Sequence, residues 1–488
     1  MIELRDAIRA RRISACEATR SALDAVGDLN GKLNAFISVF REEAMAQARA
    51  IDAKIAAHEQ TGELAGVPIA LKDNICLSWG RTTCGSRMLE EYRSPYDATV
   101  ARKLLAAGAV IIGKTNLDEF AMGSTTERSI FGPTRNPHDP TRIAGGSSGG
   151  SACAVAAGIV PGALGSDTGG SIRQPAGMCG VVGFKPSYGR VSRYGLVAYA
   201  SSLDQIGPFA RTVADAALLA SVICGHDSLD STSVQKASAD LLCGLEAPVS
   251  RLVIGVPTQA RSGANHPAVA GALERAIGRF RELGAEVIDV DLPLTSEGIA
   301  AYYIIAPAEA SSNLARFDGV RYGRRAGVQA GDELLDLYRR SRSEGFGPEV
   351  QRRIMLGTHV LSSGYYDAYY ATAQRVRALI RRDFDRAFEG SGGPTGSATG
   401  GCHAILMPSS PTPAWRIGEK TADPLAEYLE DVYTVGVNLA GLPAITVPAG
   451  VAGEAGADLP VGVQLIGPSM EDGELLRIAR MLEQAGAV

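Results

Sequence analysis

The sequence predicts an α/β fold with one layered core, and three observations support this. Hydrophobic residues make up 45% and charged residues 21% of the 488 residues, close to the averages for globular proteins. Short apolar runs with the period of a strand are separated by longer runs with helical spacing. A helix, a glycine and a buried strand follow one another at 99–112 and again at 266–290. Helices between buried strands are typical of one layered core.

The first sixty residues are expected to be helical. Apolar residues recur at loose helical spacing from Leu4 to Val26, and the Ala-rich stretch 42–58 consists of strong helix formers. We therefore predict an N-terminal helical layer at 1–60 that packs on one α/β core at 61–488.

The core is expected to begin with a strand that alternates apolar residues with Pro68, Ala70 and Lys72, so these three share one face. The segment 231–245 is expected to be a loop or weak helix, and 390–401 a flexible surface insertion. Further strands are expected at 109–112, 252–254, 286–290, 404–407, 444–447 and 461–465, and further helices at 99–107, 266–283 and 472–484.

Composition argues against several classes of protein. The net charge is −5 and no basic stripe occurs, so direct binding of nucleic acid through its phosphates is not expected. The eight cysteines are scattered without a CxxC pair, which argues against a disulfide framework and a metal site. No apolar run of about 18 residues and no apolar signal region occur, so we expect a cytoplasmic protein that does not span a membrane.

One phosphate-binding motif matches in its sequence pattern but not in the local structure that it needs. Gly108, four residues and Gly113-Lys114-Thr115 match the P-loop pattern. The four intervening residues form the expected strand, whereas a P-loop needs a Gly-rich turn whose amides face phosphate. We therefore expect no nucleotide binding here.

The run 145–151, GGSSGGS, matches the pattern G-x-S-x-G at Ser147 and again at Ser148. In α/β-hydrolases that motif is a turn from a strand to a helix, but the residues before this run are typical of a loop. None of the six histidines has a context that suggests a catalytic triad, although His359 and His403 come nearest. Apolar residues on both sides argue against a flexible linker.

Residues 162–172, GALGSDTGGSI, run from a small-residue strand into a Gly-Gly turn and a short helix that Pro175 is expected to close. Successive amides in such a turn form a concavity that suits an oxyanion. From this segment alone, Ser171 is equally a nucleophile or the N-cap of a helix.

Lys72 ends the first core strand. A lysine among buried residues can act as a neutral base, because desolvation disfavours its charged form. Taken alone, Lys72 is better explained as a strand-end lysine that reaches solvent.

Together, Lys72 in GVPIALKDNI, Ser147 in GGSSGGS and Ser171 in GSDTGGSIRQPA resemble the amidase-signature family. The resemblance continues through 182–186 and 202–208, and it implies a mixed central sheet covered by helices on both faces. It also implies that neutral Lys72 accepts a proton from Ser147, which is held by a cis peptide bond. Ser147 would relay the proton of Ser171, which attacks the amide carbon. The amides expected to bind the oxyanion are those of Thr168, Gly169, Gly170 and Ser171.

Nearly the whole chain resembles one branch of that family, the glutamine-hydrolysing A subunits of bacterial tRNA-dependent amidotransferases. The stretches 308–319, 357–370 and 437–443 carry this resemblance. It implies that glutamine is hydrolysed to ammonia without a cofactor in this chain, and that B and C subunits complete a heterotrimer. The B subunit would hold ATP and magnesium, contact the tRNA and amidate Glu-tRNA(Gln), Asp-tRNA(Asn) or both.

Glutamine carries an α-carboxylate and an α-ammonium, so its site needs opposite charges. By the same resemblance Arg353 binds the carboxylate, Asp431 binds the ammonium and Tyr302 assists. The neighbouring Arg352 is an alternative to Arg353 for this role, and either arginine could instead be an ordinary surface residue. Two departures from the family pattern bear on the rim of the site: Arg128, where asparagine is more usual, and the insertion 390–401.

Other hypotheses stay open on the sequence alone. The main alternative is a stand-alone amidase that acts on other amides and needs no partner. The remaining two are a non-catalytic structural protein of a larger complex and an ATPase that uses Lys114. Dependence on partner subunits separates an amidotransferase subunit from a stand-alone amidase. Substitution of Ser171 tests the hypothesis of a non-catalytic structural protein.

Overall fold

The computed structural model describes residues 1–236, 240–389, 401–421, 423–454 and 456–486. Their strands form one eleven-stranded sheet in the order β1-β3-β2-β4-β6-β5-β10-β11-β9-β7-β8. The strands are β1 (Phe36–Val39), β2 (Pro68–Lys72), β3 (Val110–Thr115), β4 (Gly162–Asp167), β5 (Val182–Lys185), β6 (Gln205–Ala210), β7 (Val253–Pro257), β8 (Glu286–Val290), β9 (Ala404–Pro408), β10 (Ala444–Glu454) and β11 (Ala457–Ile466).

The predicted α/β class with a mixed sheet is confirmed. β2 runs parallel to β3 and β4, and β7 runs parallel to β8 and β9, whereas the strands between these groups pair antiparallel. The helices are α1 (Ile2–Arg9), α2 (Ala15–Leu33), α3 (Arg41–Ala56), α4 (Thr99–Ala106), α5 (Gly149–Ala156), α6 (Arg173–Cys179), α7 (Val213–Ile223), α8 (Pro267–Glu282), α9 (Thr295–Asn313), α10 (Leu334–Gly345), α11 (Pro348–Val360), α12 (Thr372–Glu389), α13 (Pro424–Tyr428), α14 (Val435–Ala440) and α15 (Asp472–Gln484).

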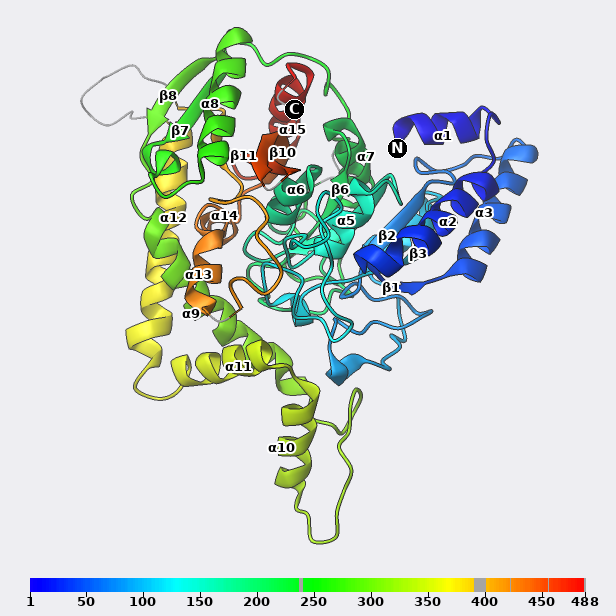
Figure 1. The fold of residues 1–488 in the computed structure, drawn as a ribbon, viewed down its shortest axis with the longest axis vertical. Helices are drawn as coiled ribbons and strands as arrows, with labels where there is room; N and C mark the ends of the chain where they lie inside the picture. The colour runs from blue at the N-terminus through cyan, green and yellow to red at the C-terminus, as the bar shows by residue number, and fades with distance from the viewer. Residues whose placement is uncertain (237–239, 390–400, 422, 455, 487–488) are drawn as a thin grey trace.

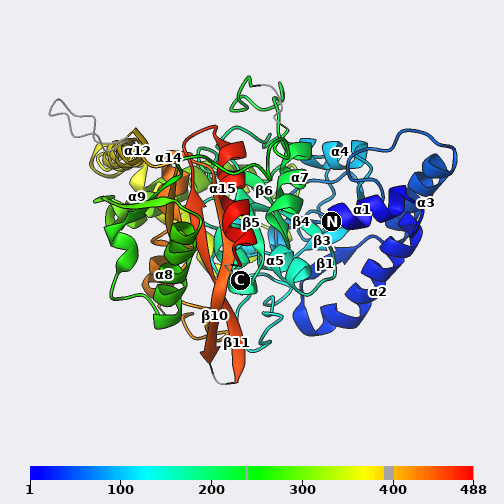
Figure 2. The same ribbon diagram turned by 90° about the horizontal axis from the view of Figure 1, so that it is seen from above.

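The sheet has a hydrophobic cluster on each face, because alternate residues of its strands point to opposite sides. Ile69 and Leu71 belong to the cluster that includes α4, α7, α8 and α15, whereas Ala70 belongs to the one formed with α2, α3, α5 and α6. Helices therefore cover both faces (Figures 1 and 2). Lys72, two residues beyond Ala70, lies on the face of α5.

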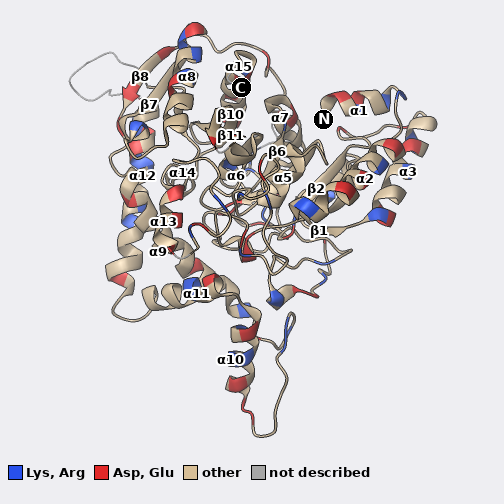
Figure 3. Cartoon of the chain, in the orientation of Figure 1, with Lys and Arg blue, Asp and Glu red and all other residues tan. Residues whose placement is uncertain are grey.

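Helices α9 to α14 lie at one side of the sheet (Figure 1). α9 packs against α11, α12 and α14, and α10 projects away from the body of the molecule (Figure 1). Lysines and arginines alternate with acidic residues along α10 and α12 (Figure 3). Acidic and basic residues are thus mixed on both helices.

Three local expectations were wrong. The N-terminal segment is not helical throughout, because β1 pairs antiparallel with β3 at the sheet edge; a strand of four residues between two helices has too few residues to show a period. β10 and β11 extend beyond the predicted 444–447 and 461–465. Pro175 does not close α6 but lies in its first turn, where a missing amide N–H costs no hydrogen bond, and the helix ends at Gly180 in a left-handed conformation.

The residues that match the P-loop pattern form β3 and the two residues before it, so the strand that the sequence indicated is present. Lys114 is wholly buried, and its Nζ donates to Asp73 Oδ1 at 2.8 Å and to Thr82 Oγ1 at 3.2 Å. The described part of 231–245 forms turns and loops. The predicted insertion 390–401 lies outside the described residues except for Gly401.

Candidate active site

Lys72 lies at the end of β2 with none of its surface exposed. Its Nζ lies 2.8 Å from Ser147 Oγ and 2.8 Å from Ser148 Oγ, and it donates to Ser166 Oγ at 3.0 Å and to the Ser166 carbonyl at 3.3 Å. β4, which carries Ser166, runs beside β2, and α5 begins after Ser148. The sheet and this helix therefore enclose the ammonium group, which excludes a lysine that reaches solvent.

Burial shifts the charge state of Lys72. Desolvation lowers the pKa of Lys72 from 10.5 to about 7, although the charges of Asp118, Asp167 and Asp204 act in the opposite direction. All four hydrogen-bond contacts of Nζ are with uncharged oxygens. A large fraction of Lys72 is therefore neutral near pH 7 and able to accept a proton.

Ser147 follows a cis peptide bond from Gly146, as the family resemblance implied. The turn packs tightly against the loop after β3. Asp118 N donates to the Ser147 carbonyl at 3.2 Å, and a Cβ on Gly146 would come within 2.3 Å of Asp118 Oδ2. Only glycine fits at position 146, and the Ser147 hydroxyl is thereby held toward Lys72.

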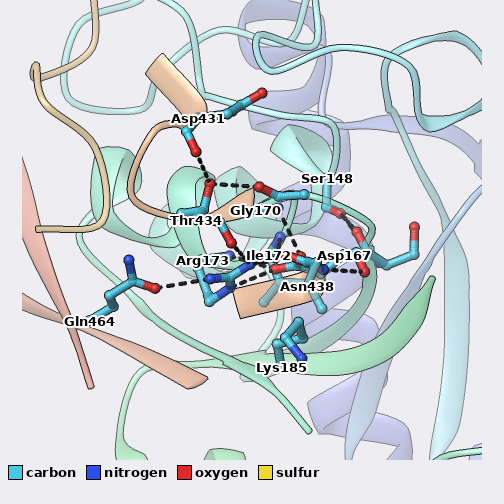
Figure 4. A network of polar contacts seen from close by, with 12 residues as sticks. Ser148, Asp167, Gly170, Ile172, Arg173, Lys185, Asp431, Thr434, Asn438 and Gln464 are labelled. Atoms are coloured by element: carbon cyan, nitrogen blue, oxygen red, sulfur yellow. Dashed lines mark hydrogen bonds and ion pairs between the residues drawn. The ribbon is translucent and has the colours of Figure 1, made fainter. Parts of the chain in front are cut away.

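The loop that carries Ser171 is built around the carboxylate of Asp167 (Figure 4). This carboxylate accepts hydrogen bonds from Gly170 N at 2.9 Å, Ile172 N at 3.2 Å and Arg173 Nε at 3.0 Å. Burial raises the pKa of Asp167, but the charge and hydrogen bonds of Arg173 outweigh it and hold the pKa at about 2. The loop therefore folds over a permanently ionised anchor.

Distant segments complete this anchor. Arg173 also donates to Gln464 Oε1 at 2.9 Å and to the Thr434 carbonyl at 3.1 Å. Thr434 Oγ1 donates to the Gly169 carbonyl at 2.6 Å, and Asn438 Nδ2 donates to Asp167 Oδ1 at 2.9 Å (Figure 4). The start of α14 is thus attached directly to the Ser171 loop.

Ser171 differs from Lys72 and Ser147, which are wholly buried, because 8% of its surface is exposed. Within the described residues its hydroxyl makes no hydrogen bond, although its carbonyl accepts one from Ser148 N at 3.2 Å. The amides of Gly169 and Ser171 are also unpaired in the described part of the chain. The Gly170 amide, expected as a further oxyanion donor, instead donates to Asp167. The Thr168 amide, like those of Gly169 and Ser171, makes no hydrogen bond to a described residue, and the Thr168 hydroxyl donates to Asp204.

The structure distinguishes the two neighbouring arginines of α11. Arg353 is buried, donates from Nε to Glu349 Oε1 at 2.9 Å and from Nη1 to the Tyr199 hydroxyl at 2.6 Å, and lies 5.2 Å from the centroid of the Tyr303 ring. Its Nη2 makes no hydrogen bond to any described residue. Arg352 has 49% of its side chain exposed and pairs with the other oxygen of Glu349. Only Arg353 faces the interior.

Asp431 lies at the hydroxyl end of Tyr303. Its Oδ2 accepts from the Tyr303 hydroxyl at 3.1 Å, and both oxygens accept from Ser124 Oγ, at 3.2 and 3.1 Å. Burial raises the pKa of Asp431 to about 7, whereas the hydrogen bonds from Tyr303 and Ser124 lower it. The structure therefore brings Arg353 and Asp431 together around one aromatic ring.

Tyr302 connects this pair to the Ser171 loop. A Cβ on Gly169 would lie 2.6 Å from Cζ of the Tyr302 ring, so the ring packs directly on the loop backbone. All three residues predicted to bind substrate thus border the loop that carries Ser171 or lie one side chain away from it.

Sequence reasoning missed several residues of the site. Ser148 and Ser166 hold Lys72, and the second G-x-S-x-G match at Ser148 was a usable signal for the first of them. Thr434 and Asn438 come from far along the chain, and no local pattern indicated that they reach Asp167.

Other candidate features lie apart from this centre. His403 Nδ1 accepts a hydrogen bond from Val253 N, and the His359 ring lies tilted against the ring of Tyr365. In the described ranges no group of three His, Cys, Asp or Glu residues could hold a metal ion, and no described helix is both long and apolar enough to cross a membrane.

Comparison with known proteins places this geometry in a family. The amidase family profile matches residues 17–476. The chain is 54% identical over 482 residues to the A subunit of glutamyl-tRNA(Gln) amidotransferase from Carboxydothermus hydrogenoformans, covering 99% of this chain and 96% of that protein. It is 53% identical to the protein of the same name from Moorella thermoacetica, with the same coverage.

Comparison with solved structures leads to the same family. The crystal structure of the A subunit of glutamyl-tRNA(Gln) amidotransferase from Thermotoga maritima superposes with a TM-score of 0.78 at 45% identity, covering 96% of this chain and 91% of that one. A structure from a vestigial protein complex that reveals the evolutionary origins of an s-triazine catabolic enzyme reaches a TM-score of 0.85 at 33% identity, covering 99% of this chain and 98% of that one. The match to the family profile and these full-length relatives show that the chain belongs to the amidase family.

Proposed function

We propose that this chain is the glutamine-hydrolysing subunit of a tRNA-dependent amidotransferase, and that Lys72, Ser147 and Ser171 carry out the hydrolysis. The observation that carries the proposal is the wholly buried Lys72, whose Nζ lies 2.8 Å from Ser147 Oγ after a cis peptide bond. Relatives at more than half identity bear the name of such a subunit.

The reaction begins with neutral Lys72 as the base. Ser147 passes a proton to Lys72 and accepts one from Ser171, whose oxygen attacks the amide carbon of glutamine. The oxyanion is bound by the amides of Thr168, Gly169 and Ser171, which have no other acceptor among the described residues, and the proton returns to the departing ammonia. Water then hydrolyses the glutamyl ester on Ser171 by the same relay.

Arg353, Asp431 and Tyr302 orient the substrate. The free Nη2 of Arg353 suits the α-carboxylate, Asp431 suits the α-ammonium, and Tyr302 borders the oxyanion loop. This arrangement favours glutamine over amides that lack both charges.

Ammonia released here is used by partners of this chain. We assign the amidation of Glu-tRNA(Gln) or Asp-tRNA(Asn) to a B subunit that binds tRNA, ATP and magnesium, within a cytoplasmic heterotrimer completed by a C subunit. No cofactor is assigned to this chain.

Co-expression with B and C subunits and an assay of glutamine-dependent ammonia release test this proposal. The complex is expected to release ammonia from glutamine, the isolated chain to be feeble, and Ser171→Ala to abolish release. Efficient hydrolysis of simple amides by the isolated chain would favour the stand-alone amidase instead. Ammonia release that Ser171→Ala leaves unchanged would rule out the mechanism.

A further inference from the structure

We propose that Arg128 and Glu427 form a positioning pair for Asp431. The pair holds Asp431 in place, and Arg128 neutralises the charge of Glu427 beside it, so that the site selects amides bearing an ammonium group. The inference rests on the proposed function in taking Asp431 as the residue that binds the ammonium. Neither residue contacts Ser147 or Ser171 through any hydrogen bond in the described part of the chain.

The pair has the geometry of a strong, specific interaction. Arg128 donates from Nη1 to Glu427 Oε1 at 2.6 Å and from Nη2 to Glu427 Oε2 at 2.6 Å. Two parallel charge-assisted hydrogen bonds fix orientation as well as distance. Only 18% of the Arg128 side chain and 3% of the Glu427 side chain are exposed, so the pair is largely shielded from solvent.

This pair fastens the loop after β3 to the segment that carries Asp431. Ser124 of that loop donates to Asp431 through its hydroxyl and to Glu427 Oε1 through its amide, at 3.4 Å. Within the loop, the Asp118 carboxylate accepts from the Arg128 amide at 3.2 Å, and Asp118 N donates to the Ser147 carbonyl. One loop therefore contacts both the proton relay and Asp431.

The charges around Asp431 give the pair an electrostatic role. Tyr302 and Tyr303 face Asp431 from α9, Arg353 from α11, Glu427 from α13 and Ser124 from the loop. Glu427 raises the pKa of Asp431, and Arg353 lowers it.

Without Arg128, Glu427 would be a buried, uncompensated carboxylate next to Asp431. The pKa of Asp431 would then rise further, and a larger fraction of Asp431 would be protonated near pH 7. A protonated Asp431 has no charge with which to attract an ammonium group.

The test uses the complex with its partner subunits and two amides, glutamine and propionamide, the second having no ammonium. Arg128→Gln is expected to raise the KM for glutamine about tenfold at pH 6.5, equivalent to about 1.4 kcal/mol, and to leave kcat/KM for propionamide unchanged. The excess KM is expected to shrink at pH 8.5, because Asp431 ionises as the pH rises. The double variant Arg128→Gln/Glu427→Gln, which removes both charges, is expected to recover most of the affinity.

Two controls separate this effect from misfolding. Arg480→Gln removes an arginine of α15 that pairs with Glu246 and Glu483 and is similarly buried, at 23% exposure of its side chain; it is expected to leave both substrates unaffected. Labelling of Ser171 by a fluorophosphonate reports whether each variant retains a reactive serine.

The inference is overturned if the double variant is as poor as Arg128→Gln, if the KM excess is equal at both pH values, or if propionamide is affected equally. A wild-type complex that releases no ammonia from glutamine refutes the proposed function instead. In that case asparagine and leucinamide replace glutamine in the same comparison. A wild type with no preference for these ammonium-bearing amides over propionamide also overturns the inference.

Discussion

Replacing Lys72 with methionine is expected to inactivate the protein and yet to stabilise it below neutral pH. Burial lowers the pKa of Lys72 from 10.5 to about 7, so the unfolded chain binds a proton at this position that the folded chain binds weakly. The folded pKa is the lower one, and stability at this residue therefore rises with pH between about 7 and 10.5. Below pH 7 the amine is protonated in the folded and the unfolded chain, and the full free-energy cost of burying its charge lowers the stability of the fold.

The magnitude follows from that difference in pKa. A shift of this size costs about 5 kcal/mol at pH 6.5 and about 1 kcal/mol at pH 9.5. Methionine removes this cost but deprives Ser147, Ser148 and Ser166 of a shared hydrogen-bond donor, at about 1 kcal/mol each. The variant is expected to be more stable by about 1–2 kcal/mol at pH 6.5 and less stable than the wild type at pH 9.5.

Urea unfolding of the wild-type chain and Lys72→Met at these two pH values, followed by fluorescence, measures the difference. Ser171→Ala serves as a matched inactive control, since it removes the nucleophile and leaves Lys72 in place; its stability change is expected to be the same at both pH values. A Lys72→Met effect that does not depend on pH would refute the argument, because it would mean that Lys72 remains charged when buried.

Two further expectations follow from the site. With Lys72 as the base, kcat for glutamine, in whose complex Asp431 is already paired with the ammonium, is expected to rise about tenfold per pH unit below pH 7 and to level off above it; a kcat profile that is flat from pH 5.5 to 8 would contradict this. Thr434→Val removes the hydroxyl that donates to the Gly169 carbonyl at 2.6 Å but keeps the shape of the side chain, so a fall of about tenfold in kcat is expected from a displaced oxyanion loop. The Thr412→Val variant, which loses a hydroxyl bound to Glu430, is the control and is expected to keep normal kcat.

The positions of the candidate catalytic residues could be predicted from sequence where they depend on short segments. Lys72, Ser147 and Ser171 each lie in a run whose residue types constrain the backbone, and together these runs resemble one family. The alternation of Ala70 and Lys72 also placed the lysine on the correct face of β2, and the structure buries it there.

What could not be predicted depends on contacts between distant parts of the chain. The sequence predicts that the amides of the turn carrying Gly170 bind an oxyanion, but the Gly170 amide donates to the Asp167 carboxylate. No short sequence pattern shows which donor a carboxylate will bind. The choice between Arg352 and Arg353 depends on how α11 packs against α9, which places Arg353 beside Tyr303. β1 is too short to be recognised without its pairing to β3.

Residues far along the chain hold the loop that is anchored on Asp167. The segment that carries Ser147 and Ser171 therefore does not form the site by itself. The segment with Ser147 and Ser171 is contiguous, but the Arg173 guanidinium that shapes it is wholly buried and is held by Thr434, Asn438 and Gln464. A natural or engineered fragment that ends before these residues would carry every reacting group and still lack the loop geometry. The reactive segment and its C-terminal supports are therefore expected to be inherited together, as one unit of selection.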